Sequence, residues 1–197
     1  MSVNPQYTGW PVWLDSRGFV DQAAHPHVID RAWQAFIVSL KEGWSAHADF
    51  MRLDPKGEFY LWRLLQDDLT DKVHPGTSLD GVLVLICMAE AIAVGLSIVK
   101  GLRWDAGARL GFAFRWAKLN RRQLASWANP LVTVRPGHKA YSDDVTTYIE
   151  VPLDTPVSAI APFVEEATRE LFALFDGYAM PSGAVEHWTK KLVERNL

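Results

Sequence analysis

The stretch ARLGFAFRWAKLNRRQLASWANP, residues 108–130, decides how the fold of this chain is interpreted. In its first half large apolar residues alternate with small or charged ones, which places Leu110, Phe112, Phe114 and Trp116 on one side. Side chains of a strand point alternately to its two faces, so residues 110–116 are predicted to form a strand with one buried face. The second half is polar and basic, and it brings arginines and a Trp-Asn pair to one place.

Two other segments alternate in the same way. Residues 145–151 alternate apolar and polar side chains, which predicts a strand with one buried face. Residues 58–66 are apolar on both faces, which is typical of a strand in the centre of a sheet. A further short strand is expected at residues 131–135.

Helical spacing covers much of the remaining chain. Apolar residues recur at intervals of four, three and four from Ile29 through Trp33 and Phe36 to Leu40, so residues 28–41 are predicted to be helical. A second short helix is expected at residues 45–52. Towards the C-terminus, a helix is predicted to begin between residues 158 and 162, and a last short helix to carry an inner stripe of Val185, Trp188 and Leu192.

The longest apolar segment is residues 78–103, in which only Glu90 is charged between positions 81 and 99. Such a segment is long enough to cross a membrane. A lone carboxylate in the middle of a bilayer is costly, however, so a central helix covered by the rest of the domain is the favoured interpretation. Ser78 is the expected N-cap of this helix.

This order of elements predicts an α+β fold. We expect an antiparallel or mixed sheet of three to five strands, packed against a long central helix and an amphipathic C-terminal helix. Residues 1–27 are expected to be an aromatic-rich N-terminal arm, and residues 28–197 a single α+β domain.

Composition excludes several classes of protein. Of the 197 residues, 49% are hydrophobic and 22% are charged, which is typical of a globular chain. The net charge of −3 argues against a generally basic nucleic-acid-binding protein. Cys87 is the sole cysteine, so disulfides within the chain and cysteine-based zinc sites are ruled out. The N-terminal sequence lacks the pattern of a signal peptide, so a cytoplasmic protein without a membrane segment is expected.

Motifs of catalysis are missing from the sequence. It holds no G-x-S-x-G nucleophile motif, no Walker motif and no G-x-G-x-x-G motif. We therefore predict no catalytic residue, no metal ligand and no cofactor.

Three charged residues interrupt otherwise apolar elements: Arg63, Glu90 and Arg115. A buried charge normally needs a partner, so Glu90 is expected to meet Arg63 or Arg115. Two interpretations stay open: a buried ion pair, or an anion-binding pocket in which Glu90 orients the arginines. The acidic run Asp67, Asp68 and Asp71 is expected to be a solvated loop that supplies a partner to an arginine, with a Mg²⁺ site as the alternative.

The basic half of the opening stretch offers a second group of candidates. Arg121 and Arg122 come close in sequence to Trp127 and Asn129, and an arginine beside an exposed aromatic ring can hold a phosphate or stack on a base. A solvated loop with Trp127 folded under it is the favoured interpretation. The complete set of candidate ligand-binding residues is Arg63, Glu90, Arg115, Arg122, Trp127 and Asn129.

Five segments together carry a resemblance to a known family. They are YTGWP (7–11), FYLWRLLQDDL (59–69), HPGTSLD (74–80), FAFRWAKLNRRQLASWANP (112–130) and DDVTTYIEVP (143–152). This pattern resembles a region that lies C-terminal to the AlbA_2 (Schlafen-like) DNA-binding domain in prokaryotic regulators and ATP-binding proteins. The AlbA_2 domain itself is not recognised in this sequence, so its nucleic-acid binding does not carry over. The resemblance implies an accessory module that senses, binds a ligand or oligomerises in a regulatory or defence protein.

These observations favour a non-enzymatic sensing, ligand-binding or protein-interaction module of a prokaryotic regulatory or defence-type protein. Its expected partners are another protein or a companion effector or DNA-binding domain, with an anionic small ligand or a homo-oligomer as further possibilities. The first alternative is a hydrolase or nuclease acting on a phosphate-containing substrate. It would use Arg115, Arg121 and Arg122 as a clamp and Asp67, Asp68 or Glu90 as metal ligand or base. The second alternative is a structural oligomerisation domain.

Overall fold

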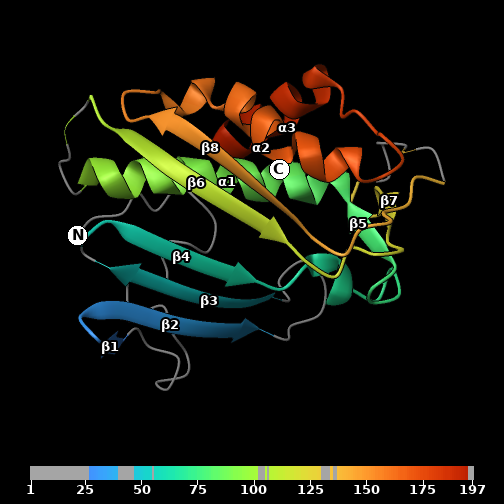
Figure 1. Cartoon of the computed structure of the whole chain (residues 1–197), viewed down its shortest axis with the longest axis horizontal. Coiled ribbons are helices and arrows are strands. Elements are labelled where there is room, and N and C mark those ends of the chain that lie inside the picture. The colour runs from blue at the N-terminus through green and yellow to red at the C-terminus, as the bar shows by residue number, and fades with distance from the viewer. Residues whose placement is uncertain are drawn as a thin grey trace.

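The structure is a computed structural model (Figure 1), and it describes residues 27–39, 47–54, 56–101, 105, 107–129, 134 and 137–194. These residues form an α+β fold, as the sequence predicts. The expected aromatic arm lies outside the described residues apart from its last position, His27.

The first half of the described chain is a four-stranded antiparallel sheet. Its strands are β1 (His27–Ile29), β2 (Ala32–Ser39), β3 (His47–Asp54) and β4 (Glu58–Arg63), and they lie side by side in that order. A two-residue turn joins β1 to β2, with φ of 50° at Asp30 and 65° at Arg31. Positive φ at both central residues is the signature of the type I′ hairpin turn.

The helices predicted at residues 28–41 and 45–52 are wrong, because both segments are strands where the structure describes them. The reason lies in β2, which carries apolar side chains on both faces. Ala35 points inward and is buried, whereas Phe36 and Val38 are exposed. A strand with two apolar faces does not show the alternation of polar and apolar residues, and its apolar positions then fit a helical spacing by chance.

The strand predicted at residues 58–66 is confirmed as β4, but its predicted position in the sheet is not. In the described part of the chain β4 is the last strand of its sheet, paired only with β3. Its second apolar face is therefore not explained by burial between two neighbouring layers. Tyr60 and Trp62 on that face are exposed.

A second antiparallel sheet is made by β6 (Arg109–Trp116) and β8 (Val145–Pro152), which pair along their whole length from Arg109↔Pro152 to Trp116↔Val145. Both strands are confirmed predictions. A short parallel pair, β5 (Ser78–Asp80) with β7 (Gln123–Ala125), forms a third small sheet. The strand expected at residues 131–135 falls outside the described residues except for Val134, which is in no strand.

The long helix α1 (Gly81–Gly101) lies at the centre of the fold (Figure 1). It is long and apolar enough to cross a membrane, but most of its residues are buried inside the domain, as expected of a core helix. Its predicted N-cap is wrong by two residues. Ser78 belongs to β5, and Asp80 caps the helix by accepting hydrogen bonds from the N–H groups of Val82 (2.9 Å) and Leu83 (3.1 Å).

Two amphipathic helices complete the core and confirm the C-terminal predictions. They are α2 (Ala161–Ala173), which covers β8, and α3 (Ser182–Glu194), and both pack against α1. Val185, Trp188 and Leu192 of α3 are buried as predicted. Two short 3-10 helices, η4 (Gln66–Asp68) and η5 (Val157–Ala159), occupy connections.

Candidate interaction surface

Arg63 and Glu90 meet in a buried ion cluster between the four-stranded sheet and α1. Arg63 Nη1 donates to Glu90 Oε2 (3.0 Å), while Nε and Nη2 donate to the two carboxylate oxygens of Asp49 at 3.0 and 2.9 Å. Glu90 and Asp49 are both buried. The guanidinium therefore joins β3 and β4 to α1, and this geometry supports the interpretation as a buried ion pair.

The same cluster explains the environment of Cys87. Its sulfur lies 3.9 Å from Arg63 Nη1. Burial raises the pKa of the Cys87 thiol, which keeps it protonated. A thiol of this kind is a poor nucleophile.

Arg115 lies elsewhere. It is exposed on the outer side of β6, and its Nη2 donates to Asp144 Oδ2 at 3.0 Å. The interpretation in which Arg115 shares an anion-binding pocket with Arg63 and Glu90 is therefore wrong. Leu110, Phe112 and Phe114 take the inner face of β6, and the alternation of the strand turns Arg115 to the solvent.

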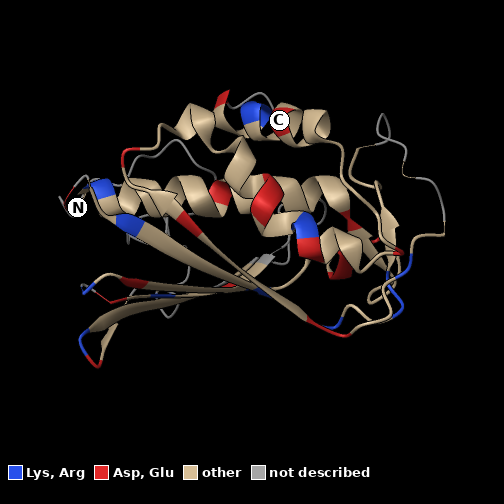
Figure 2. Ribbon diagram, turned by 45° about the horizontal axis from the view of Figure 1, so that its top comes forward, with Lys and Arg blue, Asp and Glu red and all other residues tan. Residues whose placement is uncertain are grey.

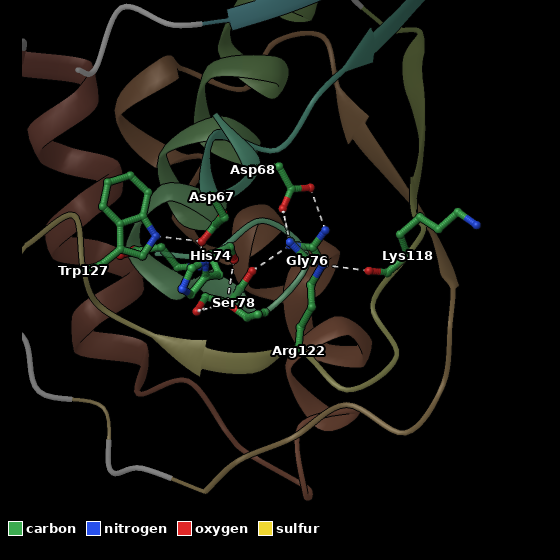
Figure 3. Close-up of polar contacts among 10 residues, drawn as sticks. Asp67, Asp68, His74, Gly76, Ser78, Lys118, Arg122 and Trp127 are labelled. Carbon is green, nitrogen blue, oxygen red and sulfur yellow. Dashed lines mark hydrogen bonds and ion pairs between the residues drawn. The ribbon is translucent and has the colours of Figure 1, made fainter. Parts of the chain in front are cut away.

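Arg122 is the centre of a second polar cluster, drawn in Figure 3. The arginine is only 2% exposed. Its Nη1 and Nη2 donate to the two carboxylate oxygens of Asp68 at 2.8 and 2.7 Å. Nη1 also donates to the Ser78 carbonyl (2.9 Å), and Nε to the Lys118 carbonyl (2.7 Å). The predicted solvated position of Arg122 is wrong, whereas the predicted supply of an arginine partner by the acidic run is confirmed.

Trp127 joins the same region through Asp67 (Figure 3). Its Nε1 donates to Asp67 Oδ1 at 2.8 Å, and the Asp80 N–H donates to the same oxygen at 2.7 Å. Asp80 Oδ2 in turn accepts from the Ala128 N–H at 2.8 Å, and the half-buried Asn129 follows directly. We call Asp67, Asp68, Asp80, Arg122 and Trp127 the polar junction, because it ties the ends of β4 and β7 to the start of α1.

The carboxylates of the polar junction differ in their pKa. Burial, with a smaller contribution from neighbouring Asp80, raises the pKa of Asp67 to about 6. Burial also raises the pKa of Asp80. Burial acts in the same direction on Asp68, but hydrogen bonds from Arg122 and the Gly76 N–H outweigh it and lower its pKa.

The contacts of the polar junction are hydrogen bonds within the protein, which hold neighbouring segments of the fold together. The Arg122 guanidinium donates four hydrogen bonds to atoms of the protein. Among the residues that the structure describes, no three His, Cys, Asp or Glu side chains come together in a way that could hold a metal ion. The candidate residues thus fall into three separate places: Arg63 with Glu90, Arg122 and Trp127 in the junction near Asn129, and Arg115 alone on β6.

The most unusual surface is the side of the four-stranded sheet that faces away from α1, which we call the outer face. Cross-strand pairing aligns Phe36 of β2, Phe50 of β3 and Trp62 of β4 in one row. Phe36 is 52% exposed and Trp62 is 45% exposed, and Tyr60 beside them is 55% exposed. Val38 on the same face is exposed too. Figure 2 colours the charged residues along the ribbon; in this sheet they belong to β3 and β4, whereas β1 and β2 carry no Lys, Arg, Asp or Glu.

The exposed apolar side chains are concentrated in this one sheet. Of the nine large apolar or aromatic side chains that are exposed in the described part of the chain, seven lie on β1, β2 and β4. Five of these seven, Ile29, Phe36, Val38, Tyr60 and Trp62, belong to the outer face, whereas Val28 and Trp33 lie on the side of Leu53. On that inner side Ala35, Met51 and Leu53 are buried. The outer face thus carries most of the exposed apolar side chains of this sheet.

Sequence reasoning missed this surface, although a signal was present. Tyr60 and Trp62 alternate with Phe59 and Leu61, so both faces of β4 were seen to be apolar. That pattern was interpreted as a central strand. An edge strand with one exposed apolar face has the same pattern, and only the sheet order separates the two.

Comparison with protein-family models, with curated proteins and with solved structures found no match to this chain.

Proposed function

We propose that this chain is a non-enzymatic protein-interaction module that binds a protein through the outer face. The observation that carries the proposal is the aromatic row Phe36–Phe50–Trp62 with exposed Tyr60 and Val38 around it. Contiguous apolar patches on a folded domain mark interaction sites. Tyrosine and tryptophan are also the residues most enriched at the energetic centres of protein interfaces.

The charges of the described residues support a protein partner over a phosphate-containing ligand. Arg63, Arg115 and Arg122 are each engaged by carboxylates of the chain itself. The hydrolase or nuclease alternative needs Arg115, Arg121 and Arg122 to act together as a clamp. Arg115 is exposed on β6 and Arg122 is buried in the polar junction, so no observation favours that alternative.

The proposed setting is an accessory module of a prokaryotic regulatory or defence protein in the cytoplasm. The family resemblance supports this setting, and the buried position of α1 supports a domain that folds in water. In such a module the polar junction and the ion cluster hold the scaffold, and the outer face recognises the partner.

A photo-crosslinking experiment tests the proposal. A benzoyl-phenylalanine is placed at Phe36, or at Tyr148 as the matched control, because both side chains are about half exposed or more while Tyr148 lies on the other sheet. The protein is produced in bacterial cells, irradiated, and its adducts are identified by mass spectrometry. We expect defined protein adducts from position 36 and none from position 148. Equal adduct patterns at both positions, or no adduct at position 36, would contradict the proposal.

A further inference from the structure

The strand β6 has one paired edge and one open edge. Among the described residues it pairs only with β8, and Figure 1 shows β8 on one side of β6 and the four-stranded sheet on the other. The Leu153 N–H donates to the Ala108 carbonyl at 3.1 Å, in register with the pairs of β6 and β8. Because alternate residues of an antiparallel strand turn both backbone groups to the same neighbour, the even-numbered residues of β6 turn theirs to β8. The groups that point to the open edge are therefore the N–H and C=O of Arg109, Gly111, Ala113 and Arg115.

The inner side of β6 is only partly covered beside this edge. Its inward-facing side chains are half-buried: Leu110, Phe112 and Phe114. Directly across from them on β8, the paired residues are buried: Val151, Ile149 and Thr147. β8 is covered by α2 and has β6 beside it, whereas β6 has a neighbouring strand on one edge only. A further strand along β6 would remove the remaining apolar surface of these side chains from water, which is favourable.

The open edge also lacks the usual protection of an edge strand. Such strands are commonly protected by a charged side chain, a proline or a bulge. β6 holds no proline, and its pairing with β8 runs without a bulge. Its two arginines, Arg109 and Arg115, turn towards β8 and its start, where each forms an ion pair with a carboxylate at 2.8 and 3.0 Å. Between them on the same side of β6 lie only the small residues Gly111 and Ala113.

We infer that residues 3–8 of this chain, VNPQYT, which precede the described residues, add to the open edge of β6 as a further strand. Apolar Val3, Pro5 and Tyr7 alternate in this segment with polar Asn4, Gln6 and Thr8. This is the pattern of a strand with one buried face. With its apolar residues inward, the segment covers the half-buried side chains of β6. The inference goes beyond the proposed function and does not depend on the outer face.

Pro5 fits this arrangement. An inward-facing residue of the added strand lies opposite an inward-facing residue of β6, whose backbone groups are already turned to β8. The N–H that Pro5 lacks would therefore point away from β6, and proline is accepted in edge strands at such positions.

The chain between this segment and β1 is long enough. Residues 9–26 can span roughly 60 Å when extended. The distance from β1 past β4 is four strand spacings, about 19 Å. Residues 3–8 can therefore reach the open edge of β6 from the far edge of the four-stranded sheet.

Engineered disulfides test the register of the added strand. Ala113→Cys is combined in turn with a cysteine at each of positions 3–8, and the rate of disulfide formation in dilute purified protein is followed by mass spectrometry. We expect the fastest rate at position 4, 6 or 8. The positions next to it in sequence should react about tenfold more slowly, because a disulfide needs both Cβ atoms on the same side of the sheet. Cys87 stays in place, because its buried thiol is protonated.

The matched control replaces Ala113→Cys by Thr146→Cys, an exposed position on the same side of β8. No fast disulfide is expected there, because β8 is one strand further from the added segment. Equal rates at all six positions, or rates as high with Thr146→Cys as with Ala113→Cys, would overturn the inference. Circular dichroism checks that the variants are folded, and Gly111→Cys replaces Ala113→Cys if the latter unfolds.

Amide hydrogen exchange of the full chain tests the pairing itself. We expect the Ala113 N–H to be protected. Removal of residues 2–8 should speed its exchange about tenfold or more, since a paired amide exchanges only when the strand opens. The Phe112 N–H, which points to β8, should keep its rate in both forms. Tyr7→Asp keeps the length of the chain and should act in the same direction as the deletion.

Three results of the exchange experiment would overturn the inference. The first is an Ala113 N–H that exchanges in the full chain as fast as in an unfolded peptide, and the second is a rate that the deletion leaves unchanged. The third is protection that rises with protein concentration, because it would assign the open edge to a second copy of the chain. None of these results bears on crosslinking from position 36, so the proposed function is tested separately.

Discussion

The two large sheets of this protein lie against the same helix but present opposite surfaces to the outside. The outer side of β6 and β8 is a network in which Arg109 pairs with Glu150 and the Tyr148 hydroxyl donates to the same carboxylate. The outer face of β1–β4 carries a row of aromatic rings instead. This contrast supports the proposal that the outer face of β1–β4 is a binding surface.

The ion pairs of the two sheets also differ, in how deeply they are buried. Beneath the four-stranded sheet, Arg63 is held by two buried carboxylates, whereas the arginines on β6 are largely exposed. The first sheet thus buries an ion cluster on its inner side and exposes aromatic side chains on its outer side. The second sheet follows the usual arrangement, with apolar residues inside and charges in water.

The largest predicted effect on stability comes from removing the buried arginine, Arg63, and is compared with the removal of the exposed Arg115. Arg63→Met leaves Asp49 and Glu90 buried without their guanidinium, so we expect the free energy of unfolding to fall by about 3 kcal/mol. Arg115→Met removes an exposed pair and should cost less than about 1 kcal/mol. Urea denaturation of both variants measures the difference. Equal losses would contradict the contrast between a buried and an exposed ion pair.

The pH dependence of stability tests the polar junction, which lies at the ends of both sheets. The pKa of Asp67 is raised from 3.8 to about 6 in the folded state, so the folded protein binds this proton more tightly than the unfolded chain does. The resulting stabilisation is complete below pH 3.8, the ordinary pKa of the group. It is lost as the pH rises to the folded-state pKa of about 6, and the free energy of unfolding then changes by about 2–3 kcal/mol.

Asp67→Asn mimics the protonated carboxyl and should remove this dependence. The free energy of unfolding of the natural chain, minus that of the variant, should therefore decrease between pH 4 and about pH 6 and then level off. Taking the difference removes the opposite contribution of Asp68, whose pKa is lowered in the folded state. Curves that stay parallel over this range would show that Asp67 is not the titrating group.

Two glycine substitutions, one on each side of β6, are expected to change the free energy of unfolding by intermediate or small amounts. A Cβ atom at Gly95 of α1 would lie 2.7 Å from the ring of Phe112 on the inner side of the strand. A Cβ atom at Gly111 would lie 2.8 Å from the Tyr148 hydroxyl on the outer side. Gly95→Ala should lower the free energy of unfolding by about 1–2 kcal/mol, because the packed ring cannot move away. Gly111→Ala should cost less than about 0.5 kcal/mol, because Tyr148 can swing into water; thermal unfolding measures both.

A small effect on stability is also expected on the outer face itself. Phe36→Ser removes a half-exposed ring, so it should change the free energy of unfolding by less than about 1 kcal/mol. The same change should abolish adducts from a crosslinker placed at Trp62. A loss of stability as large as that of Arg63→Met would mean that Phe36 belongs to the core and not to a binding surface.

The sequence predicts the helices α1, α2 and α3 and the strands β4, β6 and β8, but not the other strands. The helix α1, the strands β6 and β8 and the helices α2 and α3 each have one apolar and one polar side, or are long and wholly apolar, so their patterns are clear. β2 and β4 are apolar on both sides, and periodicity alone cannot distinguish a covered second face from an exposed one. The pairing of Arg63 with Glu90 was one of two expected outcomes because any buried charge needs a partner. The burial of Arg122 was missed, since its partners Asp68 and the Ser78 carbonyl lie far away in the chain.

Hydroxyl-radical footprinting inside cells tests the central claim most directly. Tyr60 and Tyr148 have the same side chain and are 55% and 62% exposed, so they should be oxidised at similar rates in the dilute purified protein. In cells at natural abundance, we predict that oxidation of Tyr60 and Trp62 falls several-fold while that of Tyr148 is unchanged. Equal oxidation of Tyr60 and Tyr148 under both conditions would contradict the assignment of the outer face as a binding surface.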